Sequence, residues 1–270
     1  MEKIVLITGA TDGIGLATAH RLAGRNCRLL LHGRNPEKLE RAKQEISAVA
    51  GDNVETYKAD LSRMSEVVSF ANDVASNHSK LDVLINNAGV WNATQETTGD
   101  GLDVRFAVNT IAPFLLTQKL LPMLDDSGRV VNLSSAAQAP VDLQALSGSA
   151  RLSAGAAYAQ SKLALTMWSR EMALTISDNG PVIVSVNPGS MLGSKMVKQA
   201  FGVSGGDVGI GADILTRAAL DEAFAGASGM YFDNDSGRFA SPHPDGLDGR
   251  KSREVIAAIK SVLSRVLAEG

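Results

Sequence analysis

The sequence predicts a soluble α/β protein with a doubly wound parallel sheet and helices on both faces. Three observations support this: short apolar runs alternate with longer segments of helical spacing, a glycine-rich turn follows the first run, and no linker-like change in composition occurs before about residue 233. Alternating strands and helices build βαβ units, whose parallel sheet is covered on both sides. We therefore expect residues 1–270 to form a single domain.

Six apolar runs rich in β-branched residues predict the buried strands, although periodicity alone does not exclude short helical pieces. These runs are Ile4–Ile7, Arg28–Leu31, Val54–Tyr57, Leu81–Ile85, Arg129–Leu133 and Val182–Val186. Spacing of about 3.6 residues predicts helices among and after them. The clearest are Gly15–Ala23, Pro36–Val49, Met64–Ser76 and Tyr158–Thr175.

Three segments depart from this alternation. Gln138–Gly155 is rich in Ser, Gly and Ala, and Asn187–Gly211 is broken repeatedly by glycine. Long loops inside a compact domain commonly carry function, so we expect residues 187–211 to form a substrate loop that closes as a lid. A C-terminal extension, residues 233–270, begins with a loop, Asp233–Arg250, and ends in an amphipathic helix over Ser252–Leu267.

Composition argues against several classes of partner. The formal net charge is -3, which gives no positive field for nucleic acid or an anionic membrane surface. No run reaches the roughly 18 apolar residues of a spanning helix, and the first residues lack a signal-peptide core. The four histidines are scattered along the chain, so no metal site is expected. These features predict a cytoplasmic protein.

The glycine-rich turn predicts a dinucleotide site. Thr8–Gly15, with the sequence TGATDGIG, lies between the first strand and the first helix, where free N–H groups and the helix dipole favour a pyrophosphate. A tight turn without a ligand is the alternative. The predicted cofactor contacts here are Gly9, Thr11, Asp12, Gly13, Ile14 and Gly15.

The residues after the second strand favour NADPH over NADH. An NAD site is expected to place an acid there for the ribose hydroxyl, but His32–Asn35 contains none. Arg34 offers a planar guanidinium suited to a 2′-phosphate, with Asn35 beside it. The alternative is a solvated arginine at the start of a helix.

Catalysis is predicted from a tyrosine and a lysine four residues apart. Tyr158 and Lys162 share one face of the predicted helix, so an ammonium would stand near a phenol and favour its ionised form. Upstream, Ser134 and Ser135 follow the fifth strand, where a hydroxyl could donate to a developing oxyanion. The alternative for each serine is a turn residue, and Ser134 is assigned no catalytic role.

These motifs, in this order, resemble the short-chain dehydrogenase/reductase family, whose Rossmann fold agrees with the predicted sheet. The resemblance covers roughly Lys3–Tyr231 and includes TGxxxGIG at Thr8–Gly15, NNAG at Asn86–Gly89 and YxxxK at Tyr158–Lys162. Tyr158 follows Ser135 by 23 positions, a longer step than is common in the family. Together with the sequence GMYF at Gly229–Phe232, it resembles the retinol-dehydrogenase-like branch.

The resemblance implies roles for further residues. Catalysis would fall to Ser135, Tyr158 and Lys162, with Asn109 as a fourth member that holds a water for proton exchange. A helix-interior Asn that bonds a backbone carbonyl is the alternative for Asn109. The resemblance also implies cofactor contacts at Asp60, Leu61, Asn87, Ala88, Gly89, Tyr158, Lys162, Pro188 and Gly189.

The sequence pattern leaves two contacts with the cofactor open, one at Asp60 and one after Gly189. Asp60 would contact the adenine, or else cap the next helix. The family usually places a threonine shortly after its Pro-Gly segment, and here Ser194 is the candidate contact to the nicotinamide carboxamide.

Family members commonly assemble as dimers or tetramers, which would involve Leu102–Leu121 and Tyr158–Thr175, or these apolar faces could be ordinary core.

The expected function is therefore NADP(H)-dependent interconversion of a carbonyl and an alcohol on a small-molecule substrate. Apolar side chains at Trp91 and from Met191 to Phe201 predict an apolar substrate, or else anchor the loop on the core. Two other functional classes fit the sequence less well. A catalytically silent cofactor-binding regulator would not need Asn109, Ser135, Tyr158 and Lys162 intact, and a methyltransferase would not explain Arg34 or the Tyr158–Lys162 pair.

Overall fold

One sheet runs through the computed structural model, which describes residues 2–176, 180–193, 202 and 204–268. Neighbouring strands are parallel, except for the last pair, which is antiparallel. In spatial order the strands are β3 (Val54–Lys58), β2 (Cys27–Gly33), β1 (Lys3–Ile7), β4 (Val83–Asn86), β5 (Arg129–Leu133), β6 (Val182–Asn187), β7 (Tyr231–Asp233) and β8 (Arg238–Ala240). The predicted doubly wound sheet is confirmed.

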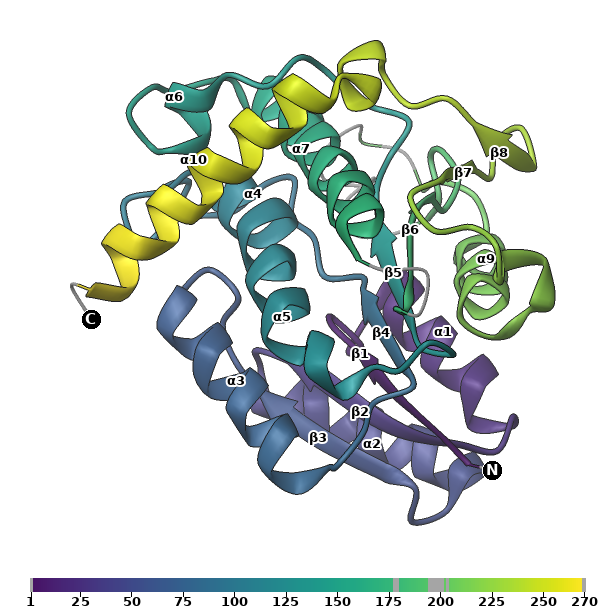
Figure 1. The fold of residues 1–270 in the computed structure, drawn as a ribbon. Helices are drawn as coiled ribbons and strands as arrows, with labels where there is room; N and C mark the ends of the chain where they lie inside the picture. The colour runs from purple at the N-terminus through teal and green to yellow at the C-terminus, as the bar shows by residue number, and fades with distance from the viewer. Residues whose placement is uncertain (1, 177–179, 194–201, 203, 269–270) are drawn as a thin grey trace.

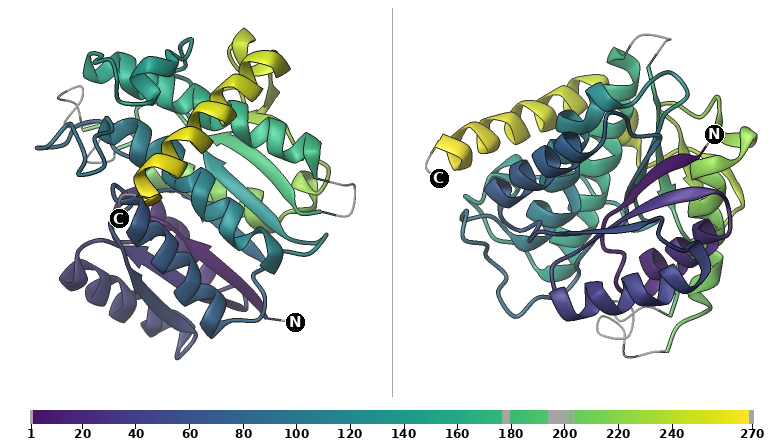
Figure 2. Two further views of the ribbon diagram at one scale, coloured as in Figure 1. Left: turned by 60° about the vertical axis from the view of Figure 1, so that its left-hand side comes forward. Right: turned by 90° about the horizontal axis from the view of Figure 1, so that it is seen from below.

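Helices cover both faces of the sheet, as Figures 1 and 2 show. One face carries α1 (Gly13–Ala23), α2 (Pro36–Ala50) and α9 (Val208–Leu220). The other face carries α3 (Met64–Asn77), α5 (Ala112–Leu120), α7 (Ala154–Thr175) and α10 (Gly249–Ala268). Short helical segments join them: α4 (Val104–Phe106), the π-helix η1 (Ala107–Ile111), η2 (Leu121–Met123), α6 (Leu143–Leu146), η3 (Glu222–Phe224) and η4 (Pro244–Leu247).

Two apolar layers hold the helices to the sheet. Because side chains alternate along a strand, Val5 and Ile7 of β1 pack into the layer under α1 and α9, whereas Leu6 packs into the opposite layer. All three are fully buried. Strands buried on both faces are expected to be continuously apolar, which explains why all six predicted runs lie within one or two residues of the observed strands.

The strand order reverses between β1 and β4. The chain leaves β1 towards β2 and leaves β4 towards β5, so the two connections diverge at the carboxyl ends of these strands. In open α/β sheets ligands bind in the crevice formed at this switch point. Ile7 pairs with Ile85 and Asn86 with Asn132, which brings the residues after β1, β4 and β5 to one edge.

The structure corrects three predicted irregular segments. Gln138–Gly155 contains α6, and α7 begins within it at Ala154. The segment Asp233–Arg250 is only partly loop, because it contains β8 and η4 and its first residue ends β7. The predicted substrate loop, residues 187–211, overlaps α9, which begins at Val208. Strands of three residues are too short to show an alternating pattern, so the β7–β8 hairpin could not be recognised.

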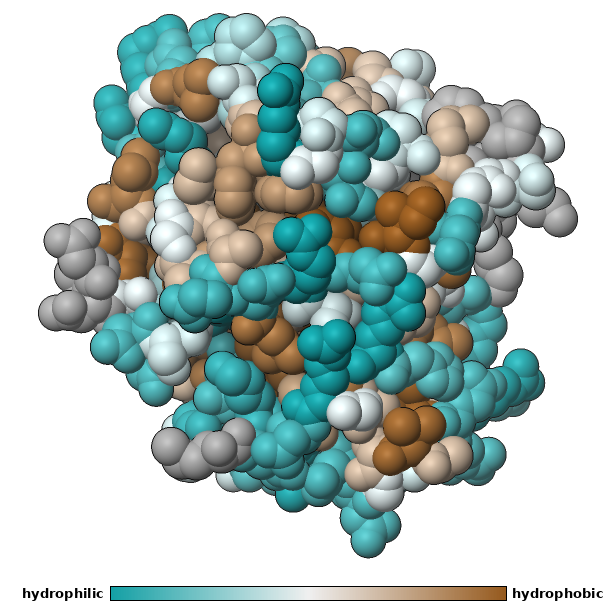
Figure 3. All heavy atoms as spheres, turned by 90° about the vertical axis from the view of Figure 1, so that its right-hand side faces the viewer, coloured by the Kyte–Doolittle hydropathy of each residue, from teal (hydrophilic) through white to brown (hydrophobic). Residues whose placement is uncertain are grey.

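The surface on the side of α9 and the β7–β8 hairpin mixes hydrophilic residues with smaller hydrophobic areas (Figure 3). Ile210 on α9 and Met230 beside β7 are among the exposed large apolar side chains. None of the helices in the described part of the chain is both long and apolar enough to cross a membrane.

Candidate active site

The glycine-rich turn brings the chain very close to the loop after β4. Gly9 has φ +66° and Gly13 has φ +53°, values that favour glycine. A Cβ on Gly15 would overlap the Gly9 carbonyl oxygen and the Asn87 side-chain amide. Asp12 caps α1 by accepting a hydrogen bond from Gly13 N–H at 2.9 Å. The turn therefore leads directly into a helix N-terminus, as the sequence predicts.

The loop after β4 supports this turn through hydrogen bonds. Asn87 Nδ2 donates to the carbonyl oxygens of Thr8 at 2.8 Å and Gly9 at 3.1 Å. Ala88 N–H donates to Thr8 Oγ1 at 3.0 Å. Asn87 and Ala88 therefore support the glycine-rich turn, and their predicted contacts with the cofactor stay a prediction.

A buried histidine stabilises the glycine-rich turn through a hydrogen bond to its backbone. His32 is 3% exposed at the end of β2, and its Nδ1 accepts a hydrogen bond from Gly9 N–H at 3.3 Å. Its Nε2 lies 3.1 Å from the Ala59 carbonyl oxygen, so Nε2 carries the proton. Burial lowers the pKa of His32 from 6.5 to about 4, because the charged ring would be desolvated.

This histidine predicts a loss of stability in acid. In the unfolded chain His32 becomes protonated below about pH 6.5, whereas in the folded protein it becomes protonated only below about pH 4. Stability is therefore present above the ordinary pKa and falls as the pH drops through this window, by about 3 kcal/mol. We expect urea unfolding of His32→Gln to lose much of the wild-type pH dependence between pH 7 and pH 4. His20→Gln, on the surface of α1, is the control, and an unchanged slope in His32→Gln would contradict the role.

The predicted adenosine contacts occupy different environments. Arg34 is exposed after β2, and its side chain makes no hydrogen bond or ion pair with the described residues. Asn35 caps α2, with its Oδ1 accepting from Lys38 N–H at 2.8 Å. Leu61 is buried in the core. The guanidinium of Arg34 is thus the group left accessible to a phosphate.

Asp60 does not cap the following helix, so that alternative is wrong. The cap residue of α3 is Arg63. Asp60 instead accepts a hydrogen bond from Ser62 N–H at 3.0 Å, while its own N–H donates to Glu66 at 2.7 Å. These bonds fix the turn between β3 and α3.

The two serines after β5 have different surroundings. Ser134 is buried, and its Oγ lies 2.7 Å from the Thr166 hydroxyl, in keeping with a structural role. Ser135 is partly exposed. Its carbonyl oxygen accepts from the Tyr231 hydroxyl at 3.1 Å and from Gln138 at 3.0 Å. The backbone of Ser135 is therefore anchored, while its hydroxyl accepts a hydrogen bond from Ala137 N–H at 3.1 Å and interacts with the Tyr158 hydroxyl on α7.

Tyr158 and Lys162 lie one turn apart on α7, as the spacing predicts, and both are buried. Lys162 Nζ is 5.7 Å from the centroid of the Tyr158 ring and donates to the Leu133 carbonyl oxygen at 2.7 Å. The structure thus brings Ser135, Tyr158 and Lys162 together at the end of β5.

Burial sets the charge states of this group. Desolvation raises the pKa of Tyr158, an effect that its hydrogen bond with Ser135 partly opposes. Desolvation also lowers the pKa of Lys162 to about 8. Burial therefore favours the protonated phenol, opposite to the effect expected from the spacing of Tyr158 and Lys162. At neutral pH the phenol keeps its proton.

Asn109 is not directed at the other three residues. It lies on the π-helix η1, a geometry that is frequent at functional sites. Its Oδ1 accepts from Val90 N–H at 2.8 Å, and its Nδ2 donates to the Val90 carbonyl oxygen at 3.0 Å and to Ser161 Oγ at 3.0 Å. The side chain therefore clamps the loop after β4 to α7, and its catalytic role stays a prediction.

The segment after β6 is held by the β7–β8 hairpin. Asn187 Nδ2 donates to Asp233 at 2.8 Å and Asp235 at 2.9 Å, and Asn234 donates to the Pro188 carbonyl oxygen at 2.9 Å. Ser190 donates twice to Asp235, from N–H at 2.7 Å and from Oγ at 2.6 Å. Pro188 and Gly189 are thus fixed in place, whereas Ser194 lies outside the described residues.

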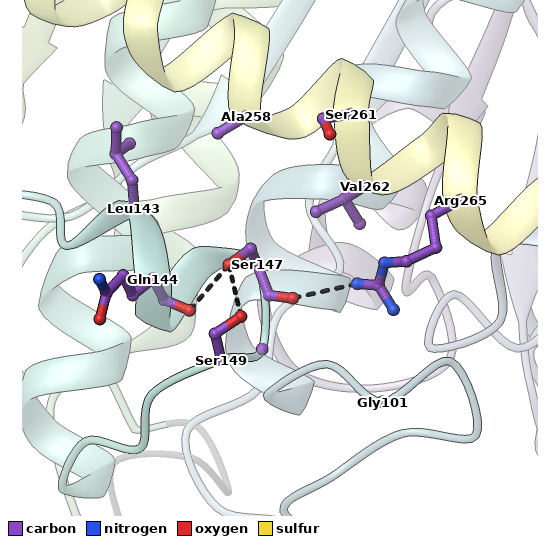
Figure 4. A pocket seen from close by; sticks show the side chains of 10 residues that line it. Gly101, Leu143, Gln144, Ser147, Ser149, Ala258, Ser261, Val262 and Arg265 are labelled. Carbon is purple, nitrogen blue, oxygen red and sulfur yellow. Dashed lines mark hydrogen bonds between the residues drawn. The ribbon is translucent and has the colours of Figure 1, made fainter.

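Two hollows in the described part of the chain differ in their position relative to the site residues. One, of about 210 Å³, adjoins the glycine-rich turn and is lined by Thr11, Asp12, Leu16, Lys38, Arg41, Ala42 and Glu45. The other, of about 580 Å³, lies between α6 and α10 (Figure 4), and its lining does not include Tyr158. Across it, Arg265 donates to the Ser147 carbonyl oxygen at 3.0 Å, which fastens the C-terminal helix to the end of α6.

Several contributing residues were not predicted as site residues. Tyr231 and Asp235 act from the C-terminal segments, and Arg105 binds the loop that carries Trp91. The one available signal was a charged residue, Arg105, inside an otherwise apolar helical stretch. Within the described residues no group of three or more His, Cys, Asp or Glu is placed to hold a metal ion.

Comparisons with known proteins agree with this geometry. The family profile described as short chain dehydrogenase matches residues 3–202. Retinol dehydrogenase 11 of Mus musculus is 39% identical over 194 residues, or 70% of this chain and 61% of that protein. Polyprenol dehydrogenase of Homo sapiens is 36% identical over 214 residues, or 74% of this chain and 64% of that protein. The chain therefore spans less than two thirds of the length of these curated relatives.

A solved structure adds a similarity in three dimensions. A short chain dehydrogenase from Shigella flexneri, crystallised in complex with NADP, is 25% identical and superposes with a TM-score of 0.70. The match covers 86% of this chain and 96% of that chain.

Proposed function

The chain belongs to the short-chain dehydrogenase family, and from that premise we propose that it is an NADP(H)-dependent oxidoreductase that interconverts a carbonyl and an alcohol on an apolar substrate. The observation that carries the proposal is the meeting of Ser135, Tyr158 and Lys162 at the carboxyl end of β5. That edge also carries the glycine-rich turn, which suits a dinucleotide.

The chain's residues fit the cofactor. The glycines of the turn leave backbone close to backbone, so a pyrophosphate can approach the N-terminus of α1 without meeting a side chain. Arg34 stands free after β2 to meet a 2′-phosphate, and Pro188 and Gly189 are fixed at the end of β6. When bound, the nicotinamide supplies or accepts the hydride.

Tyr158 is the proposed acid for carbonyl reduction. Because burial raises its pKa, its hydroxyl holds a proton at neutral pH and can donate it to the carbonyl oxygen. Ser135 donates a second hydrogen bond to the same oxygen. Below about pH 8, Lys162 carries a positive charge 5.7 Å from the Tyr158 ring, which stabilises the phenolate left behind.

The surroundings of Tyr158 support an apolar substrate. The half-buried Trp91 ring packs on the Tyr158 ring, and Met191 presents an exposed apolar side chain after Gly189. Two relatives carry the names of apolar alcohols, retinol and polyprenol. We extend that substrate class to this chain. A cytoplasmic location and a homodimer or homotetramer, both predicted from sequence, complete the proposal.

The cofactor preference is tested with Arg34→Ala. Charge-assisted hydrogen bonds to a phosphate contribute roughly 1.5–3 kcal/mol, so we expect NADPH affinity to fall by about 10-fold to 100-fold. NADH affinity should stay near the wild-type value, because NADH lacks the phosphate. Fluorescence titration with both cofactors measures the two constants.

The control is Arg25→Ala, which removes an exposed arginine from the loop between α1 and β2. Equal losses for NADPH and NADH in Arg34→Ala would contradict the preference. NADPH binding without turnover on any carbonyl compound would favour the cofactor-binding regulator instead.

A further inference from the structure

Resting on the proposed function, we propose that Arg105 is a positioning residue that fixes the Trp91 ring against Tyr158. No catalytic motif includes Arg105, and it does not touch the reacting group. It is 0% exposed, whereas arginine is almost never fully buried without partners. The hydrogen-bond partners of its guanidinium therefore indicate the role of Arg105.

Trp91 and Tyr158 form a direct aromatic contact. Their ring centroids are 4.5 Å apart, with an angle of 43° between the planes. Gly155, one turn before Tyr158 on α7, also lies beside the indole, since a Cβ there would be in van der Waals contact with Trp91 Cζ2 at 3.7 Å. The indole thus forms one wall beside the phenol and limits how far its ring can swing.

Arg105 binds the backbone of that tryptophan. Its Nε donates to the Trp91 carbonyl oxygen at 2.7 Å. Its two terminal nitrogens are held by carboxylates, Nη1 by Asp103 Oδ2 at 3.0 Å and Nη2 by Glu96 Oε1 at 2.6 Å. The acids neutralise the buried charge and orient the planar fork, so that Nε points at Trp91.

A second clamp acts one residue earlier in the same loop. Asn109 bonds both backbone groups of Val90, and it stands four residues after Arg105, about one helical turn along the same segment. Val90 and Trp91 are therefore fixed from neighbouring positions on α4 and η1. A lysine at position 105 could keep the charge but not bond Trp91 and both acids with one rigid group.

The test is a double-variant cycle on Arg105→Lys and Trp91→Ala. Misplacing a group by about 1 Å can cost up to about 100-fold in rate, and we expect each single variant to lower kcat by about 10-fold or more with an apolar carbonyl substrate. NADPH affinity should change little. Because Arg105 acts through Trp91, the double variant should be no slower than Trp91→Ala alone.

The control is Arg217→Lys, the same replacement at an exposed arginine on α9. Multiplied losses in the double variant, or a wild-type kcat in Trp91→Ala, would overturn the proposal. The second result decides the matter even if Arg105→Lys does not fold, because Trp91 is only half-buried and its truncation spares the ion pairs.

A separate readout distinguishes this proposal from the proposed function. In a Trp168→Phe background, Trp91 is the single tryptophan, and Phe also removes the unpartnered buried indole N–H of Trp168. Arg105→Lys should then make Trp91 more accessible to acrylamide quenching, whether or not a substrate has been found. Unchanged quenching would overturn the clamp, whereas failure to turn over any carbonyl compound would count against the proposed function alone.

Discussion

Tyr158→Phe is expected to abolish turnover while leaving NADPH binding nearly unchanged. The variant loses the hydroxyl that donates the proton but keeps the aromatic ring packed on Trp91. General acid catalysis contributes about 10²–10⁴-fold, so kcat should fall at least a hundredfold. Steady-state rates of NADPH consumption and fluorescence titration of the same preparation give the two quantities.

Tyr57→Phe is the matched control. It removes a phenolic hydroxyl from β3, where that group contacts Glu55 and His78. β3 is the edge strand of the sheet, and three strands separate it from β5, beside which Tyr158 lies. Its turnover should equal that of the wild type. A Tyr158→Phe variant with more than about a tenth of wild-type kcat would show that another group supplies the proton.

Gly15→Ala is expected to weaken both the fold and cofactor binding. The added methyl would overlap the Gly9 carbonyl oxygen and the Asn87 amide, and both belong to the contact that holds the turn on β4. Overpacking of this kind costs about 1–3 kcal/mol. Urea unfolding should show this loss, and NADPH affinity should fall by at least about 10-fold as the turn shifts.

Gly24→Ala is the matched control, because it makes the same replacement at the C-terminal end of the same helix, α1. Gly24 follows α1 with a negative φ, and a Cβ there would meet nothing within 4 Å. Its unfolding free energy should stay within about 0.5 kcal/mol of the wild type. Equal effects of the two substitutions would mean that the close approach at Gly15 is unimportant.

Much of the fold follows from local sequence, and the exceptions have physical causes. Buried parallel strands are continuously apolar, so β1 to β6 are visible as β-branched runs. Tyr231–Asp233 and Arg238–Ala240 are too short for such a signal, and their pairing depends on the neighbouring β6. The sequence therefore predicts more loop in the C-terminal extension than the structure contains.

The candidate site likewise contains residues that the local sequence predicts and contacts that it does not. Tyr158 and Lys162 are predictable because a helix places residues four apart on one face. The contacts of Arg105 with Trp91, of His32 with Gly9 and of Tyr231 with Ser135 join residues distant in sequence, and only packing brings them together. Burial also reverses the expected effect on Tyr158, because desolvation of the phenol has the largest influence on its pKa.

The most direct test of the proposed activity is to follow the transfer of the hydride. The wild-type protein is incubated with NADPH carrying deuterium at the reactive carbon and with a panel of apolar aldehydes and ketones, and the products are analysed by mass spectrometry. We expect an alcohol with deuterium on the former carbonyl carbon for at least one panel member, and none with Tyr158→Phe. Tight NADPH binding without deuterium in any product across a broad carbonyl panel would contradict the proposed activity.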